Sequence, residues 1–108
     1  MPNYLIEANY TCEGIKGLSR EGGTSRRAAI ENTIKSVGGT LEAVYYAFGK
    51  TDIYILVDLP DNASAAAIAL TVGATGGATV RTVVLLTPEE VDAAAKKTPA
   101  YRAPGKVG

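Results

Sequence analysis

The sequence predicts a single α+β domain in which a four-stranded antiparallel sheet carries helices on one face. Three observations predict it. In four segments, apolar and more polar side chains alternate as they do in strands. Helical patterns separate the first of these segments from the second and the third from the fourth. A chain of 108 residues is long enough to form one hydrophobic core. Hydrophobic residues make up 46% and charged residues 20%, which is the composition of a folded globular protein.

The four strand segments are residues 4–10, 40–48, 53–59 and 79–86. Because successive side chains of a strand point to opposite faces, each segment divides into two sets. One set is largely apolar and is expected to face the helices: Tyr4, Ile6, Ala8, Tyr10, Leu41, Ala43, Tyr45, Ala47, Ile53, Ile55, Val57, Leu59, Val80, Thr82, Val84 and Leu86. The other set is mixed, and its apolar members include Val44, Phe48, Leu56, Val83 and Leu85.

Helices are predicted in the two long connections. Residues 12–21 favour a short helix, and residues 24–37 repeat apolar side chains at helical spacing before Gly38-Gly39 ends the pattern. Asp61 is the expected N-cap of a helix over residues 63–72.

A further helix is predicted after the last strand, because Thr87-Pro88-Glu89-Glu90 has the spacing of a capping box with proline at the first helical position. It is expected to end near Lys97. The order β-α-β-β-α-β followed by a helix is the ferredoxin-like arrangement. We therefore assign residues 1–97 to one domain and residues 98–108 to a flexible tail, with an arm anchored by Tyr101 as the alternative.

The composition excludes several classes of function. Lysine plus arginine and aspartate plus glutamate balance at 11 each, so no broad positive field is available for nucleic acid. Histidine is absent and Cys12 is the single cysteine, which removes histidine-activated nucleophiles, histidine metal ligands and an internal disulfide. We expect no metal and no cofactor. Because no leader and no long apolar run stands out, we expect a cytoplasmic protein without a membrane partner.

The mixed face of the sheet is too apolar to remain in contact with water. Its apolar residues would be buried if a second copy of the chain packed against them. The sequence therefore predicts a homodimer or a higher homo-oligomer.

Four runs of the sequence together resemble the bacterial GYD-domain family: Tyr10-Thr11-Cys12-Glu13-Gly14-Ile15-Lys16-Gly17-Leu18, Phe48-Gly49-Lys50-Thr51-Asp52-Ile53-Tyr54, Asp58-Leu59-Pro60-Asp61-Asn62 and Leu86-Thr87-Pro88-Glu89-Glu90. The resemblance covers about residues 2–97. It implies the dimeric α/β-barrel superfamily, in which two ferredoxin-like subunits press their open sheet faces together. This chain departs from the name-giving motif, because Thr51 stands where the tyrosine would be.

Polar residues on the mixed face are the candidate ligand-binding or interface residues: Glu7, Asn9, Glu42, Tyr46, Tyr54, Asp58 and Arg81. They could hold a small polar ligand in a desolvated cavity, or they could form the salt bridges of a dimer interface. Lys16, Arg20 and Arg26, together with Arg27, form a basic group that is a candidate anion site at the rim, and a solvated helix face is the alternative. Gly49-Lys50-Thr51 imitates the end of a phosphate-binding loop, but the strand that follows favours a hairpin turn.

The favoured function is a homo-oligomeric α/β-barrel module that binds a small ligand between subunits. The alternative is a cofactor-independent enzyme, of the isomerase or oxygenase type, acting on a small polar or aromatic compound. In that case a carboxylate would serve as base and Tyr46 or Tyr54 as proton donor. A trimeric nucleotide-sensing protein is a third hypothesis. The absence of histidine favours the first.

Overall fold

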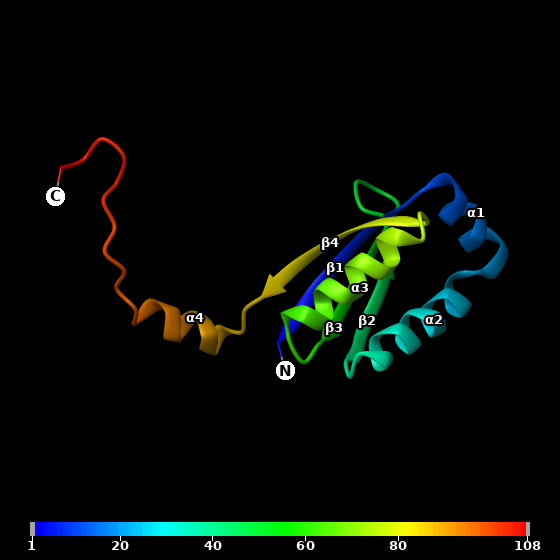
Figure 1. Ribbon diagram of the computed structural model, residues 1–108, viewed down its shortest axis with the longest axis horizontal. Coiled ribbons are helices and arrows are strands. Elements are labelled where there is room, and N and C mark those ends of the chain that lie inside the picture. The colour runs from blue at the N-terminus through cyan, green and yellow to red at the C-terminus, as the bar shows by residue number, and fades with distance from the viewer. Residues whose placement is uncertain (1, 108) are drawn as a thin grey trace.

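The computed structural model describes residues 2–107 and confirms the α+β prediction (Figure 1). One antiparallel sheet has the strand order β2-β3-β1-β4, and the element order is ferredoxin-like with an additional helix at each of two places. The predicted bounds at residues 1 and 108 lie outside the described residues. In chain order the elements are β1 (Asn3–Tyr10), α1 (Cys12–Glu21), α2 (Gly23–Ser36), β2 (Thr40–Tyr46), β3 (Ile53–Asp58), α3 (Asn62–Ala74), β4 (Ala78–Leu85) and α4 (Pro88–Ala95).

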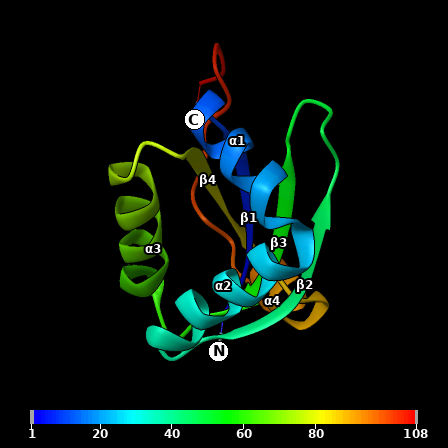
Figure 2. The ribbon, with the colours of Figure 1, turned by 90° about the vertical axis from the view of Figure 1, so that its right-hand side faces the viewer.

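The core lies between the sheet and two helices on one of its faces. Helix α2 packs over β2 and α3 packs over β4, so the helices stand above the two edge strands (Figure 2). The Tyr4 hydroxyl donates a hydrogen bond to Asn62 Oδ1 and so ties the start of α3 to β1. The most deeply buried large side chains come from both layers: Tyr4, Ile34, Ile53, Val57 and Leu59.

The predicted faces of the second strand are wrong beyond Glu42. Leu41 lies opposite Val57, but the next paired residue, Ala43, lies opposite Leu56, so Glu42 is an extra residue in a β-bulge. A bulge places two residues against one, and every later side chain of that strand changes face.

As a result, Val44 and Tyr46 lie on the helix-covered face, opposite Ile55 and Ile53. Ala43 and Tyr45 take their places on the open face. The strand also ends at Tyr46, so Phe48 lies in the following loop, where its ring stacks on that of Tyr46 at a centroid distance of 5.9 Å.

Helix α3 begins at the predicted N-cap. Asp61 Oδ1 accepts hydrogen bonds from the Ser64 backbone N–H at 2.8 Å and from the Ser64 hydroxyl at 2.7 Å. These two bonds stabilise the ionised carboxylate and lower the pKa of Asp61 below its ordinary value of 3.8.

Asp61→Asn is expected to remove a pH dependence of stability. Because the folded pKa is depressed, the carboxylate's contribution is complete above pH 3.8 and is lost as pH falls through the lower folded value. Asparagine still accepts the Ser64 N–H but does not titrate. Urea unfolding between about pH 6 and about pH 2 should show wild type losing more stability than the variant. A difference between the two that stays constant with pH would contradict this assignment.

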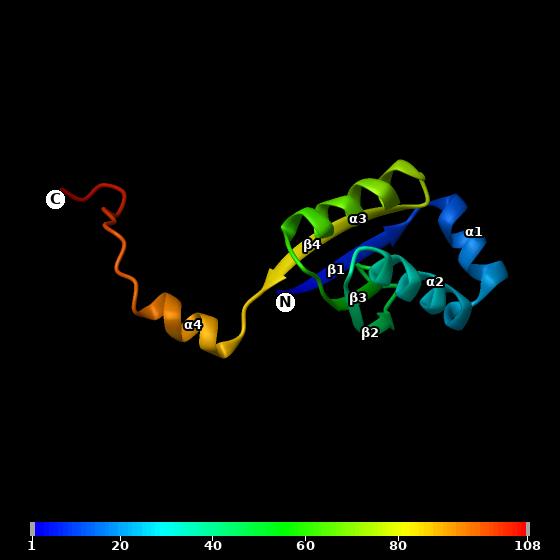
Figure 3. The ribbon, with the colours of Figure 1, turned by 60° about the horizontal axis from the view of Figure 1, so that its bottom comes forward.

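Helices α1 and α4 lie outside the two main layers. Helix α1 stands at one end of the sheet, and α4 projects from the other end and leads into the extended tail (Figures 1 and 3). The predicted capping box of α4 is confirmed, since Thr87 and Glu90 exchange side-chain-to-backbone hydrogen bonds of 3.1 and 2.9 Å. Flexibility of residues 98–107 stays a prediction.

Among residues 2–107, no helix has both the length and the apolar character needed to cross a bilayer.

Candidate functional site

A polar pocket of about 580 Å³ opens on the uncovered face of the sheet, beside the hairpin that joins β2 to β3. Strands β1, β3 and β4 supply its floor, and the hairpin supplies one wall. Its lining consists of Glu7, Asn9, Lys50, Thr51, Tyr54 and Arg81.

Thr51 is at the centre of the polar network in this pocket. Its side chain is buried, with 4% of the residue exposed. The Thr51 hydroxyl donates to Glu7 Oε1 at 3.2 Å and accepts from Arg81 Nη2 at 3.1 Å. Glu7 and Arg81 are cross-strand neighbours on β1 and β4, so the hydroxyl connects two opposite charges. The arrangement fixes the guanidinium at the edge of the pocket.

Asn9 anchors the hairpin to β1. Its Nδ2 donates to the Lys50 carbonyl at 2.9 Å, and its Oδ1 accepts from Arg81 Nη2 at 3.3 Å. Asp52 Oδ2 accepts from the Tyr10 N–H at 2.8 Å. The run Gly49-Lys50-Thr51 is therefore a hairpin turn that leads into β3, as the sequence predicted, and not a phosphate-binding loop before a helix.

Replacing Thr51 with valine is expected to destabilise the fold by about 1.5–3 kcal/mol, the usual value of hydrogen bonds to charged groups. Valine keeps the shape but leaves Glu7 and Arg81 without their common partner. Thr51→Ser, which retains the hydroxyl, is the matched control and should lose less. Urea unfolding measures both variants. Equal losses would mean that the methyl group, and not the hydroxyl, matters.

The structure brings together four of the seven candidates predicted on this face, namely Glu7, Asn9, Tyr54 and Arg81. Asp58 is paired with Asn3 at the opposite end of β1, and Glu42 is the exposed bulge residue.

Tyr46 lies on the other face of the sheet because of the bulge. Its hydroxyl donates to the Gly23 carbonyl at 3.0 Å. Sequence reasoning missed Lys50 and Thr51 as pocket residues. Both residues lie in the turn between β2 and β3, and their contacts with Asn9 and Glu7 on β1 join segments that are distant in the sequence.

A second cavity, of about 260 Å³, lies on the helix-covered face and was not predicted from the sequence. It is bounded by α1 and α2 on one side and by α3 on the other, above β1 and β3. Its lining is mainly apolar. Arg26, a predicted rim residue, lies at this cavity and not at the open-face pocket, whereas Lys16 and Arg20 are exposed on α1.

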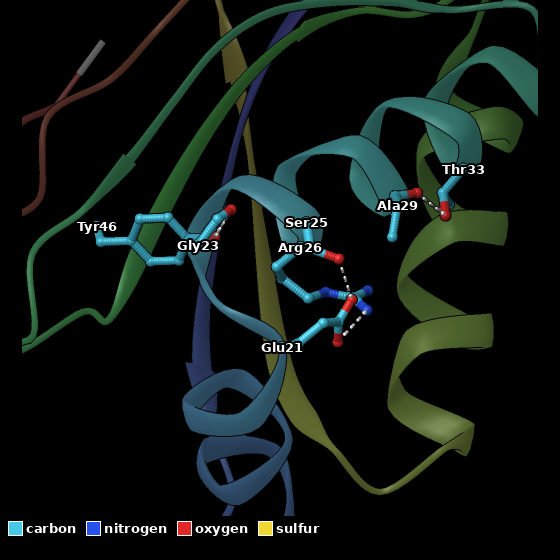
Figure 4. Close-up of polar contacts among 7 residues, drawn as sticks. All are labelled: Glu21, Gly23, Ser25, Arg26, Ala29, Thr33 and Tyr46. Carbon is cyan, nitrogen blue, oxygen red and sulfur yellow. Dashed lines mark hydrogen bonds and ion pairs between the residues drawn. The ribbon is translucent and has the colours of Figure 1, made fainter.

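The polar end of this cavity is the corner between α1 and α2 (Figure 4). Arg26 Nη1 lies 3.9 Å from Glu21 Oε2, and the Ser25 hydroxyl donates to Glu21 Oε1 at 3.4 Å. Burial raises the pKa of the Tyr10 phenol, which also lines the cavity, and the neighbouring Tyr46 adds to this shift. The Tyr10 phenol is thus partly desolvated, whereas the Arg26 and Glu21 side chains each remain 38% exposed.

A comparison with models of known protein families identifies the family of this chain. A model of the GYD domain family matches residues 4–95, which span the sheet and all four helices up to the last residue of α4. No curated protein and no solved structure matches the chain.

Proposed function

Since the chain belongs to the GYD-domain family, we propose that it acts as a homodimeric module in which two open sheet faces pack together and enclose a small polar ligand. The observation that carries the proposal is the open face itself. Helices α2 and α3 both lie on the other face. The side chains left on the open face include Leu5, Tyr45, Leu56, Val83 and Leu85.

Packing two such faces removes the apolar side chains around the polar pocket from water, which is the main favourable term in association. In a twofold dimer the same surface of each subunit faces its copy on the other, so the open faces of both subunits are buried in one interface. The polar pocket would then lie inside the interface. There Arg81 and Glu7 would interact with a ligand in surroundings of lower dielectric constant, where the Coulomb interaction between charges is stronger than in water.

Helix α4 supports the same proposal. The family match includes α4 completely, yet α4 projects from the body of the single chain (Figure 1). Together with the tail that follows it, α4 extends the chain to a radius of gyration of 17.5 Å, whereas a compact chain of this length has about 13 Å. Leu86 and Val91 are exposed before and on the helix. In the proposed dimer these residues pack against the second subunit.

Native mass spectrometry tests the proposal. The expected result is an ion with twice the mass of one chain, carrying an additional small mass that is lost at higher collision energy. A monomer at micromolar concentration would contradict the dimer. A dimer without added mass, which also fails to take up any compound from a library of polar metabolites, would contradict ligand binding alone.

A further inference from the structure

The cavity on the helix-covered face is lined largely by isoleucine side chains. Six of the seven isoleucines of the chain line it, and each is at most 9% exposed. They come from both layers: Ile6 on β1, Ile30 and Ile34 on α2, Ile53 and Ile55 on β3, and Ile68 on α3.

Two features account for the free volume of the cavity: the position of the helices over the sheet and the small size of several of their side chains. Helix α2 packs mainly against edge strand β2 and α3 against edge strand β4, and the cavity lies between these helices, above β1 and β3. Helix α3 is rich in alanine and directs few long side chains into the space. On α1, Gly17 lines the cavity, and a Cβ added there would meet nothing within 4 Å.

The size of the cavity limits what it can hold. An apolar cavity of about 150 Å³ stays dry and accepts benzene. In proportion, about 260 Å³ accommodates roughly ten non-hydrogen atoms.

The polar end of the cavity holds one cation, Arg26, and one anion, Glu21. Arg26 has five N–H donors, and its pairing with Glu21, at 3.9 Å, is at the limit of an ion pair. Arg26 also lies in the first turn of α2, which has no acidic residue and no side-chain cap there. Because α1 ends at Glu21 and α2 begins at Gly23, the negative end of one helix dipole and the positive end of the other meet here, so the attraction for an anion comes from the guanidinium itself.

We propose that this cavity binds a small monocarboxylic acid of about eight carbons, with its chain among the isoleucines and its carboxylate on Arg26. The ligand's head would form charge-assisted hydrogen bonds with the guanidinium, and its body would bury apolar surface. The site lies on the opposite face of the sheet from the proposed dimer interface, so it does not rest on the proposed function.

Octanoate is the probe, and an NMR titration of protein labelled at the isoleucine methyl groups locates it. The expected result is saturable shifts of the six cavity isoleucines, with Ile15, which is outside the cavity, unchanged. No saturable shift at millimolar octanoate, or equal shifts of Ile15, would overturn the proposal.

Two pairs of measurements test the mode of binding by calorimetry. Gly17→Leu extends a side chain into the free space and should reduce octanoate affinity at least tenfold. Gly73→Leu, in α3 and outside the cavity but equally free of neighbours within 4 Å, should leave the octanoate affinity unchanged.

Arg26→Gln should weaken octanoate binding about tenfold and leave octanol binding unchanged. Equal affinities of wild type and Gly17→Leu would overturn the site, and equal losses of octanoate and octanol would overturn the role of Arg26.

Discussion

Gly14→Ala is expected to destabilise the protein by about 2–3 kcal/mol, a cost typical of overpacking. A Cβ on residue 14 would lie 2.0 Å from the Gly77 carbonyl oxygen and 3.1 Å from a ring carbon of Tyr10. The carbonyl belongs to backbone that is already fixed, since the Thr11 N–H donates to the same oxygen at 3.0 Å. The Thr11 hydroxyl also donates to the Gly76 carbonyl, at 2.8 Å.

Because backbone cannot move aside as a flexible side chain can, α1 would have to separate from the loop between α3 and β4. Gly17→Ala is the matched control in the same helix, where the new methyl group meets no atom within 4 Å. It should be neutral or stabilising by up to about 1 kcal/mol, the helix-propensity difference. Urea unfolding followed by circular dichroism measures both variants. If Gly14→Ala were as stable as Gly17→Ala, the close approach of α1 to this loop would be wrong.

Local patterns predicted the elements because each had a strong signal of its own. The capping box at Thr87, the N-cap at Asp61 and the terminating Gly38, which has a φ of 82°, all occur where they were expected. Such signals act within one turn of chain, so a single sequence reveals them.

The bulge at Glu42 could not be predicted in this way. Residues 40–48 carry apolar side chains at both parities, so either division yields one acceptable core face. The choice depends on pairing with β3, where Ile53 and Ile55 require Tyr46 and Val44 opposite them. Pairing is a contact between distant segments, and one strand's own alternation does not record it.

The two pockets differ in how far the sequence indicated them. Four strand residues of the polar pocket were predicted from the alternation of side chains between the two faces of each strand. The prediction succeeded because β1, β3 and β4 pair in a regular register. The apolar cavity was missed, since its isoleucines have the same pattern as a filled core. The two cases differ in how α1, α2 and α3 are placed around the space, which depends on contacts between distant segments. The small residues of α3 and Gly17 were the sole indications in the sequence.

Val83→Glu is expected to raise the dissociation constant of the proposed dimer about a thousandfold or more. Val83 lies on the open face of β4, opposite Leu5, and is 39% exposed in the single chain. In a twofold interface the substitution introduces two carboxylates into apolar surroundings, and an unpaired buried charge costs several kcal/mol. Analytical ultracentrifugation should therefore find a monomer at concentrations where the wild type is a dimer.

The adjacent residue supplies the control. Val84 is on the same strand and is 57% exposed, but it points to the helix side, opposite Tyr4. Val84→Glu adds the same charge one residue further along and should leave the dimer intact, while both variants keep the wild-type circular dichroism spectrum. Because the two positions differ in parity and in little else, their comparison identifies the interacting face. Equal weakening by both would place the contact at the edge of β4, and a wild-type monomer would remove the dimer altogether.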